Sequence, residues 1–154
     1  MNYEIAVLLH NVRSAHNVGS IFRTADAAGV LHIYLSGYTP SPIDRFGRTR
    51  KEIAKTALGA ERMIQWSRVL NLSKTLSHLK QEGWNIIGVE QDARARDYRS
   101  LSIKKPAVFV FGNEVRGLSE PLRALCDELV EIPMRGKKES LNVSVTAGII
   151  LFNT

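Results

Sequence analysis

Short runs of apolar residues alternate along this chain with segments whose apolar residues recur every three or four positions. The short runs lie at residues 4–9, 32–35, 85–89, 107–111 and 129–132, and the segments of helical period lie at residues 19–28, 73–82, 120–126 and 143–152. Such alternation is typical of a mostly parallel sheet that helices cover on both faces, with right-handed crossovers. The pattern therefore predicts an α/β fold.

The first of the predicted helices covers residues 19–28. Its apolar residues share one face, and Arg23 falls off that face. We expect Asn17 to cap the N-terminus of this helix and Gly29 to end it.

Composition favours one domain spanning residues 1–154. With 154 residues, 44% of them hydrophobic, the chain can bury its own core. The apolar runs are too short for a bilayer span and no signal-peptide layout opens the chain, so we expect a cytoplasmic protein without membrane contact. The single cysteine, Cys126, excludes an internal disulfide and is predicted to be a small core residue. The four histidines lack metal-ligand spacing, and no metal site is predicted.

The formal net charge is +6 and the isoelectric point is near 9.7, which favours a polyanionic partner. As the partner, nucleic acid is favoured over an anionic membrane surface. Residues 37–51 combine prolines and glycines with several charges, a composition that predicts a mobile surface loop.

Residues 131–145 join a short apolar strand to a helix through a basic loop that contains glycine. The strand end offers apolar surface at Ile132 and Met134, the loop offers positive charge, and Ser140 and Asn142 offer oxygens where helical N–H groups begin. The segment therefore suits a ligand-holding junction. A capped helix after an exposed loop is the alternative.

In open α/β sheets, ligands bind beyond the carboxyl ends of the strands. Three loops there carry unusual residues, at 10–23, 112–119 and 135–142. None has the Rossmann glycine pattern or the P-loop, because the stretch from Gly112 to Gly117 lacks both the spacing and the lysine. A nicotinamide or ATP enzyme is disfavoured.

Taken in order, the segments 11–30, 109–118 and 132–145 resemble the motifs of the SpoU/TrmH family within the SPOUT superfamily. Members of that family are RNA ribose 2′-O-methyltransferases that use S-adenosylmethionine. The resemblance runs from about residue 4 to the C-terminus and is loose over residues 43–99.

The resemblance implies a C-terminal trefoil knot that binds the methyl donor, in an obligate homodimer with active sites near the interface. It implies cofactor contacts at Gly112, Ile132, Met134 and Leu141. The implied polar residues of the active centre are Arg23, Asn17, Glu114, Ser140 and Asn142. In the family the arginine is the proposed base. Since arginine stays protonated in proteins, clamping a phosphate or stabilising an alkoxide suits Arg23 better, and its role in proton transfer stays open.

Each of these residues also has a structural interpretation. Arg23 could be a solvated residue or part of a dimer ion pair, Asn17 only a cap, and Glu114 a partner of Arg116 in a turn. Ser140 and Asn142 could be partly structural.

The candidate RNA contacts are basic side chains, although most charge runs are solvated faces. They are Arg45, Arg48, Arg50, Lys51 and Arg135, with Arg94, Arg96 and Arg99 as further candidates.

The expected function is methylation of a ribose 2′-hydroxyl in RNA, with tRNA ahead of rRNA because the chain is as short as small tRNA-modifying relatives. Two alternatives are a non-catalytic RNA-binding or assembly factor and a small-molecule enzyme. The chain lacks the N-terminal RNA-binding extension of several relatives, so we expect the catalytic domain and its dimer partner to recognise RNA. The last helix is also shorter than is usual in the family, which predicts a reduced or altered dimer interface.

Overall fold

The computed structural model describes residues 2–154, which form one sheet of seven parallel strands in the order β3-β2-β1-β6-β4-β7-β5. The strands are β1 (Ile5–His10), β2 (His32–Ser36), β3 (Gln65–Val69), β4 (Asn85–Val89), β5 (Arg96–Asp97), β6 (Ala107–Phe111) and β7 (Glu128–Glu131).

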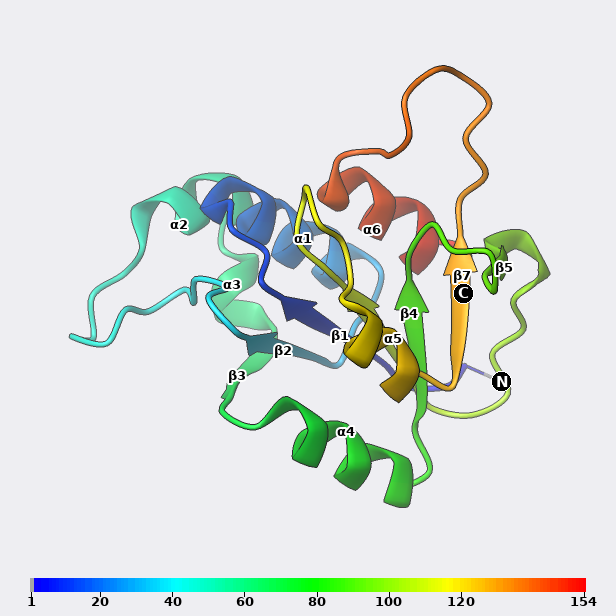
Figure 1. Cartoon of the computed structure of the whole chain (residues 1–154). Coiled ribbons are helices and arrows are strands. Elements are labelled where there is room, and N and C mark those ends of the chain that lie inside the picture. Colours follow the sequence, from blue (N-terminus) through cyan, green and yellow to red (C-terminus); the bar gives the residue numbers. More distant parts are fainter. Residues whose placement is uncertain (1) are drawn as a thin grey trace.

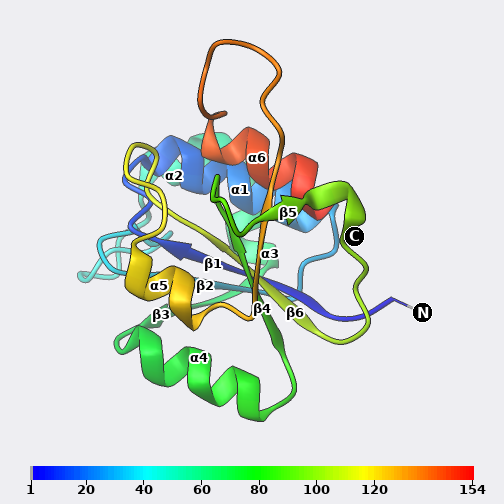
Figure 2. The same cartoon turned by 45° about the vertical axis from the view of Figure 1, so that its right-hand side comes forward.

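Helices cover both faces of this sheet, as Figures 1 and 2 show. One face carries α1 (Ala15–Ala27), α2 (Lys51–Ala57), α3 (Ala60–Met63) and α6 (Val143–Leu151). The other face carries α4 (Leu72–Gln81) and α5 (Glu120–Leu125). A short 3₁₀ helix (Tyr98–Ser100) follows β5. The predicted α/β fold is confirmed.

Two hydrophobic cores lie on opposite faces of the central strands. In β1, Val7 and Leu9 pack towards α1 and α6, whereas Ala6 and Leu8 pack towards α4 and α5. Because helices cover both faces, these strands cannot alternate polar and apolar residues, and they are continuous apolar runs. This is why the central strands can be recognised in the sequence.

The segment between β2 and α4 contains elements that the apolar pattern does not predict. Edge strand β3 has the sequence Gln-Trp-Ser-Arg-Val, in which only Val69 is buried. Helix α2 begins at Lys51, the last residue of the predicted loop, and buries only Ile53 and Ala57. Short, partly exposed elements lack the apolar run or long stripe on which the prediction relied.

The predicted cap of α1 is wrong. The helix begins at Ala15, and the Ser14 hydroxyl accepts a hydrogen bond from the Asn17 backbone N–H at 3.2 Å. Ser14 therefore supplies the N-cap, and Asn17 lies within the first turn with its side chain available for other contacts.

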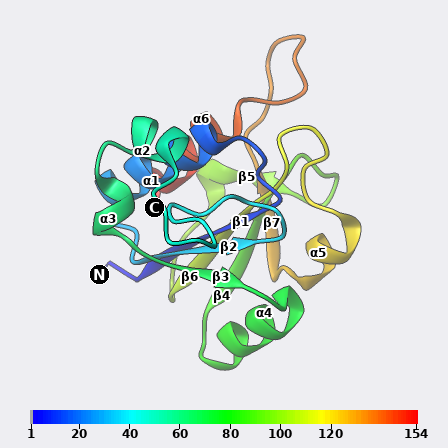
Figure 3. The same ribbon diagram turned by 90° about the vertical axis from the view of Figure 1, so that its left-hand side faces the viewer.

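Parallel pairing brings the carboxyl ends of β1, β4, β6 and β7 to the same edge of the sheet. The loop between β7 and α6 rises above this edge in Figure 3. Across residues 2–154, the structure has no helix with the length and apolar character that a bilayer crossing requires.

Candidate active site

A pocket lies where the ends of β4, β6 and β7 face the start of α6. All four predicted cofactor residues contribute to its wall, namely Gly112, Ile132, Met134 and Leu141. The remaining wall residues include Glu90, Gln91, Asn113, Glu114, Val115, Glu131, Ser140 and Thr146. Residues that are far apart in the sequence thus meet in one site.

Glycine is required at the base of the pocket because the loop after β6 folds tightly back on itself. A Cβ atom on Gly112 would lie 2.6 Å from the carbonyl carbon and oxygen of Gly117. The loop is closed by hydrogen bonds between Asn113 and Gly117, and Gly117 has a φ of +64°, which other residues rarely adopt. The loop can close in this way only because neither Gly112 nor Gly117 has a side chain.

Glu90, the residue after β4, ties this loop to its neighbours. Its carboxylate accepts hydrogen bonds from the backbone N–H groups of Leu118 at 2.7 Å and Gln91 at 2.9 Å. The Gln91 side-chain amide in turn donates to the carbonyl of Ile132 at 2.7 Å. The end of β4 therefore positions the loops that follow β6 and β7.

Glu114 holds the loop after β6 against the N-terminus of α1. Its carboxylate accepts hydrogen bonds from the backbone N–H groups of Arg13 and Ser14, both at 3.0 Å, and from the side-chain amide of Asn17 at 3.2 Å. Partial burial opposes ionisation, but these donors outweigh burial and lower the pKa of the Glu114 carboxyl. The alternative pairing with Arg116 is not formed.

Asn17 extends this contact to α6. The side-chain amide of Asn142 donates to the Asn17 side-chain oxygen at 3.2 Å. Asn142 also caps α6, because its oxygen accepts from the Ser144 backbone N–H at 2.9 Å. Glu114, Asn17 and Asn142 thus form a polar relay that joins the three motif segments.

Arg23 does not reach this pocket within its own chain. It lies six residues after Asn17 in α1, which is about 240° further around the helix. Its side chain is exposed in a separate hollow with Asp26, Leu58, Arg62 and Met63.

The candidate RNA-binding residues lie outside the pocket. The guanidinium groups of Arg45 and Arg48 lie 4.7 and 4.9 Å from the ring centre of Phe46, and Arg48 also pairs with Asp44 at 2.9 Å. Arg50 donates to the carbonyl of Ser41 at 3.0 Å and thereby closes the loop internally. Lys51, at the start of α2, and Arg135, in the loop after β7, are exposed.

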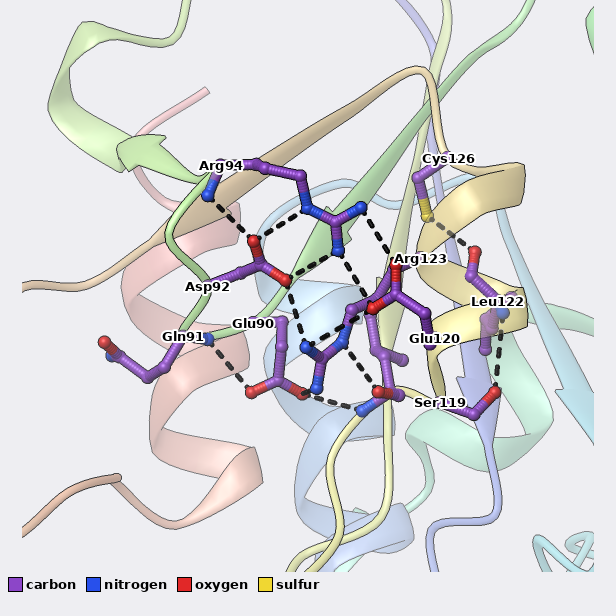
Figure 4. A network of polar contacts seen from close by, with 10 residues as sticks. Glu90, Gln91, Asp92, Arg94, Ser119, Glu120, Leu122, Arg123 and Cys126 are labelled. Atoms are coloured by element: carbon purple, nitrogen blue, oxygen red, sulfur yellow. Dashed lines mark hydrogen bonds and ion pairs between the residues drawn. The ribbon is translucent and has the colours of Figure 1, made fainter.

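A network of ion pairs joins the segment after β4 to α5, as Figure 4 shows. Asp92 accepts hydrogen bonds from Arg94 and from Arg123, at 2.8 and 3.0 Å, and Arg94 also reaches Glu120 at 3.0 Å. Hydrogen bonds from the Arg94 side chain and backbone, aided by Arg123, hold the pKa of Asp92 well below its usual range. Arg123 also donates to the carbonyl of Leu118 at 2.8 Å.

The remaining candidates from the sequence are also placed. Arg96 pairs with Glu128 at 2.6 Å, and Arg99 pairs with Asp97. Cys126 ends α5 half-buried, and burial raises the pKa of its thiol to about 11, which suits a packing residue rather than a nucleophile. Within the described part of the chain, no group of three or more histidine, cysteine or carboxylate side chains could hold a metal ion.

Sequence reasoning missed Glu90, Gln91 and Thr146 in the pocket wall. Glu90 could have been found, because a polar residue directly after a buried strand lies at the ligand edge of the sheet. The backbone donors of Arg13 and Ser14 have no sequence signal, since any residue carries an N–H group.

These features define an α/β protein whose ligand pocket is built by loops at the carboxyl edge of a parallel sheet. Residues 4–152 match the model of the SpoU rRNA Methylase family. The chain belongs to this family, and the resemblance seen in its three motif segments is confirmed.

Curated relatives support the same assignment. The 23S rRNA (guanosine-2′-O-)-methyltransferase RlmB of Ralstonia nicotianae is 39% identical over 148 residues, which are 96% of this chain and 57% of that protein. The chain thus spans little more than half the length of the curated relatives that it matches.

Two solved structures share the fold. An AdoMet-bound rRNA methyltransferase from Sinorhizobium meliloti matches with a TM-score of 0.89 and 32% identity, over 99% of this chain and 56% of that one. The TrmH/SpoU tRNA modifying enzyme of A. aeolicus matches with a TM-score of 0.85 and 30% identity, over 99% of this chain and 74% of that one.

Proposed function

We propose that this protein methylates a ribose 2′-hydroxyl of RNA with S-adenosylmethionine as the methyl donor. The observation that carries the proposal is that the second and third family segments line one pocket, and that Asn17 of the first segment is hydrogen-bonded to both, through Glu114 and Asn142. The AdoMet-bound relative and the 2′-O-methyltransferase relative support it.

The pocket has the chemistry that the donor requires. Apolar side chains at Ile132, Met134 and Leu141, together with closely folded backbone, suit an adenosyl group. The carboxylates of Glu90, Glu114 and Glu131 also line the pocket and complement the positive charge of a sulfonium and an amino group. When bound, the donor would supply an electrophilic methyl group: its C–S bond would break as the C–O bond to the 2′-oxygen forms, the thioether would leave as S-adenosylhomocysteine, and the hydroxyl proton would pass to solvent.

The polar relay positions the acceptor. Glu114 is a positioning residue rather than a base, because its lowered pKa keeps it ionised and three N–H groups engage its carboxylate. Asn17 and Asn142 extend this relay from Glu114, which lines the pocket, and they hold the three segments in the register that orients the ribose hydroxyl towards the donor.

Arg23 acts in the pocket of a second protomer in a homodimer. Two features support this role: the side chain is exposed far from its own pocket, and the apolar side chains of Leu58 and Met63 beside it are 66% and 74% exposed. A dimer contact would cover them. The arginine charge then stabilises the developing alkoxide or holds a phosphate.

RNA binding falls to the basic loops. Arg45 and Arg48 lie exposed in the loop between β2 and α2, Lys51 begins α2, and Arg135 lies on the loop after β7. We favour tRNA over rRNA as the substrate; the TrmH/SpoU tRNA modifying enzyme of A. aeolicus, which shares the fold, supports this preference. The trefoil knot stays a prediction of the family resemblance.

The test is transfer of labelled methyl groups to separated tRNA and rRNA fractions that lack the modification. Wild type, Arg23→Ala and the neighbouring control Arg62→Ala are compared, and donor affinity is measured independently. We expect label in 2′-O-methyl nucleotides with wild type and Arg62→Ala only. Donor binding without label in either RNA would favour a non-catalytic RNA-binding factor.

Mixed dimers test the placement of Arg23. Arg23→Ala and Asn142→Ala protomers are each expected to be inactive alone. If Arg23 serves the second protomer, random exchange restores about a quarter of wild-type activity, since half of the dimers are mixed and each has one intact site. If Arg23 serves its own pocket, mixing restores nothing.

A further inference from the structure

A second hollow lies against the donor pocket. Its wall consists of Arg13, Ser14, Tyr38, Asn113, Glu114, Val115 and Arg116. Asn113, Glu114 and Val115 belong to both cavities, so this short stretch of loop separates them. Two cavities that share lining residues can hold a donor and an acceptor side by side, as transfer of a group between two bound molecules requires.

The hollow offers an unusual amount of exposed apolar surface. The side chain of Val115 is 92% exposed and that of Tyr38 is 57% exposed. The Tyr38 hydroxyl accepts a hydrogen bond from the Asn113 side-chain amide at 3.0 Å, and the Tyr38 backbone N–H donates to the Asn11 side-chain oxygen at 3.1 Å. The ring is thus held at both ends, and a ligand that stacks on it does not have to immobilise it.

The same Asn113 amide also donates to the backbone carbonyl of Asn11 at 3.0 Å. Asn11 has a φ of +57°, and a Cβ atom on Gly37 would lie 1.8 Å from its side-chain oxygen. The loops after β1, β2 and β6 are therefore locked together around the ring of Tyr38.

Positive charge flanks this ring. Across residues 2–154, the guanidinium groups of Arg13 and Arg116 form no ion pair and no hydrogen bond with another side chain, and both are exposed. An aromatic face between two free cations matches a nucleotide, whose base stacks on an aromatic ring and whose phosphates bind arginine.

We propose that this hollow binds the acceptor nucleotide of the RNA, with its base against Tyr38 and Val115 and its flanking phosphates at Arg13 and Arg116. The inference rests on the proposed function and names the substrate subsite. The ribose then lies over Glu114 and meets the donor where the two cavities join, at the residues that line both. The Tyr38 and Ser14 hydroxyls each already accept a hydrogen bond and keep only one O–H donor, so the hollow binds the base mainly by stacking and discriminates weakly among bases.

The test compares Tyr38→Ala with Tyr38→Phe, which keeps the ring, and with Leu70→Ala, which removes an exposed apolar side chain elsewhere. Filter binding to unmodified tRNA transcripts gives RNA affinity, calorimetry gives donor affinity, and methyl transfer gives KM and kcat. We expect Tyr38→Ala to weaken RNA binding and raise the RNA KM by roughly 5- to 100-fold, with donor affinity unchanged. Tyr38→Phe and Leu70→Ala should stay within about twofold of wild type.

A second arm examines charge with Arg116→Gln and the control Lys74→Gln, on α4 at the opposite face of the sheet. Losing one phosphate contact should lower the slope of log affinity against log salt by about one. Lys74→Gln should leave that slope unchanged.

The outcomes separate this inference from the proposed function. If wild type methylates RNA and both Tyr38→Ala and Arg116→Gln bind RNA like wild type, the subsite is overturned while the function stands. If wild type binds the donor but methylates no RNA, the function fails; a selective loss of RNA affinity in the two variants would still support a nucleotide subsite, and unchanged affinity would remove it.

Discussion

Two arginine-rich regions lie at the same edge of the sheet and behave in opposite ways. Arg94 and Arg123 are paired with Asp92 and Glu120 in a network where every charge has a partner (Figure 4). Arg13 and Arg116, on the other side of the loop after β6, point to open space without such partners among the described residues. Residue type alone does not separate structural cations from binding cations.

The difference follows from what each region has to hold. The network fixes the N-terminus of α5 to the end of β4, and its acidic residues cancel its positive charge. On the open side, formed by Arg13, Arg116 and Glu114, the two arginines have no acidic partner among residues 2–154. The Glu114 carboxylate accepts hydrogen bonds from backbone N–H groups instead of pairing with them. The arginines of the network are therefore neutralised by carboxylates, whereas the arginines of the open side can bind a polyanion.

Among these predictions, Glu114→Gln should have the largest effect, because it loosens the loop after β6 on the open side. A glutamine presents an NH₂ group towards N–H donors, so the loop after β6 should shift from the N-terminus of α1. Misplacement by about 1 Å can reduce a rate about 100-fold, and we expect kcat for methyl transfer to fall by roughly that factor. The matched control, Glu120→Gln, changes an exposed carboxylate of the network and should keep most activity. Equal losses in the two variants would contradict the distinction between the regions.

Gly112→Ala tests the tight loop that separates the two regions. Its new Cβ atom would meet the backbone of Gly117 at 2.6 Å, and relieving such overpacking costs about 1–3 kcal/mol. Denaturant unfolding should show that loss of stability. Gly136→Ala is the control, because nothing lies within 4 Å of the added atom. A Gly112→Ala variant as stable as wild type would show that the loop can relax without cost.

Arg123→Met tests the network. The variant loses the hydrogen bond to the Leu118 carbonyl and one partner of Asp92, and it should lower the free energy of unfolding by about 1–2 kcal/mol. RNA affinity should stay unchanged, because this arginine is already paired. Arg99→Met, which removes an exposed pair with a near neighbour in sequence, should leave stability close to wild type.

Lowering the pH should have the smallest effect on stability. It should also show which of the two regions keeps its carboxylate ionised to lower pH. The pKa of Glu114 and the pKa of Asp92 are both lowered in the folded protein, so each carboxylate stabilises the fold above its ordinary pKa of about 4. That stabilisation disappears as the pH falls through the folded pKa. Because the pKa of Asp92 is lowered further, the stability difference between wild type and Asp92→Asn should persist to lower pH than that between wild type and Glu114→Gln. Unfolding free energies measured between pH 6 and pH 2 would reveal the order.

Much of the fold could be predicted because its central strands are buried on both faces. Runs such as Ala107–Phe111 must be apolar throughout, and they are visible without any tertiary information. Strand β3 and helix α2 escaped prediction because they bury only a few side chains at the edge of the sheet.

The site was predicted as a set of residue types rather than as a geometry. Gly112, Ile132, Met134 and Leu141 could be predicted as cofactor residues, and the structure places all four around one pocket. Asn17 was predicted as a cap, which Ser14 provides instead, and nothing in the sequence distinguished Tyr38 within its charged loop.

The sequence by itself determined the α/β class, the family and the residue types of the pocket, because periodicity and local motifs are written in consecutive residues. Only the tertiary structure decided which charges are paired, where Arg23 lies and which side chains meet. The bonds from Asn17 to Glu114 and to Asn142 join residues 97 and 125 positions apart. Contacts over such separations exist only once the strands have paired and their carboxyl ends share one edge, so no local pattern could encode them.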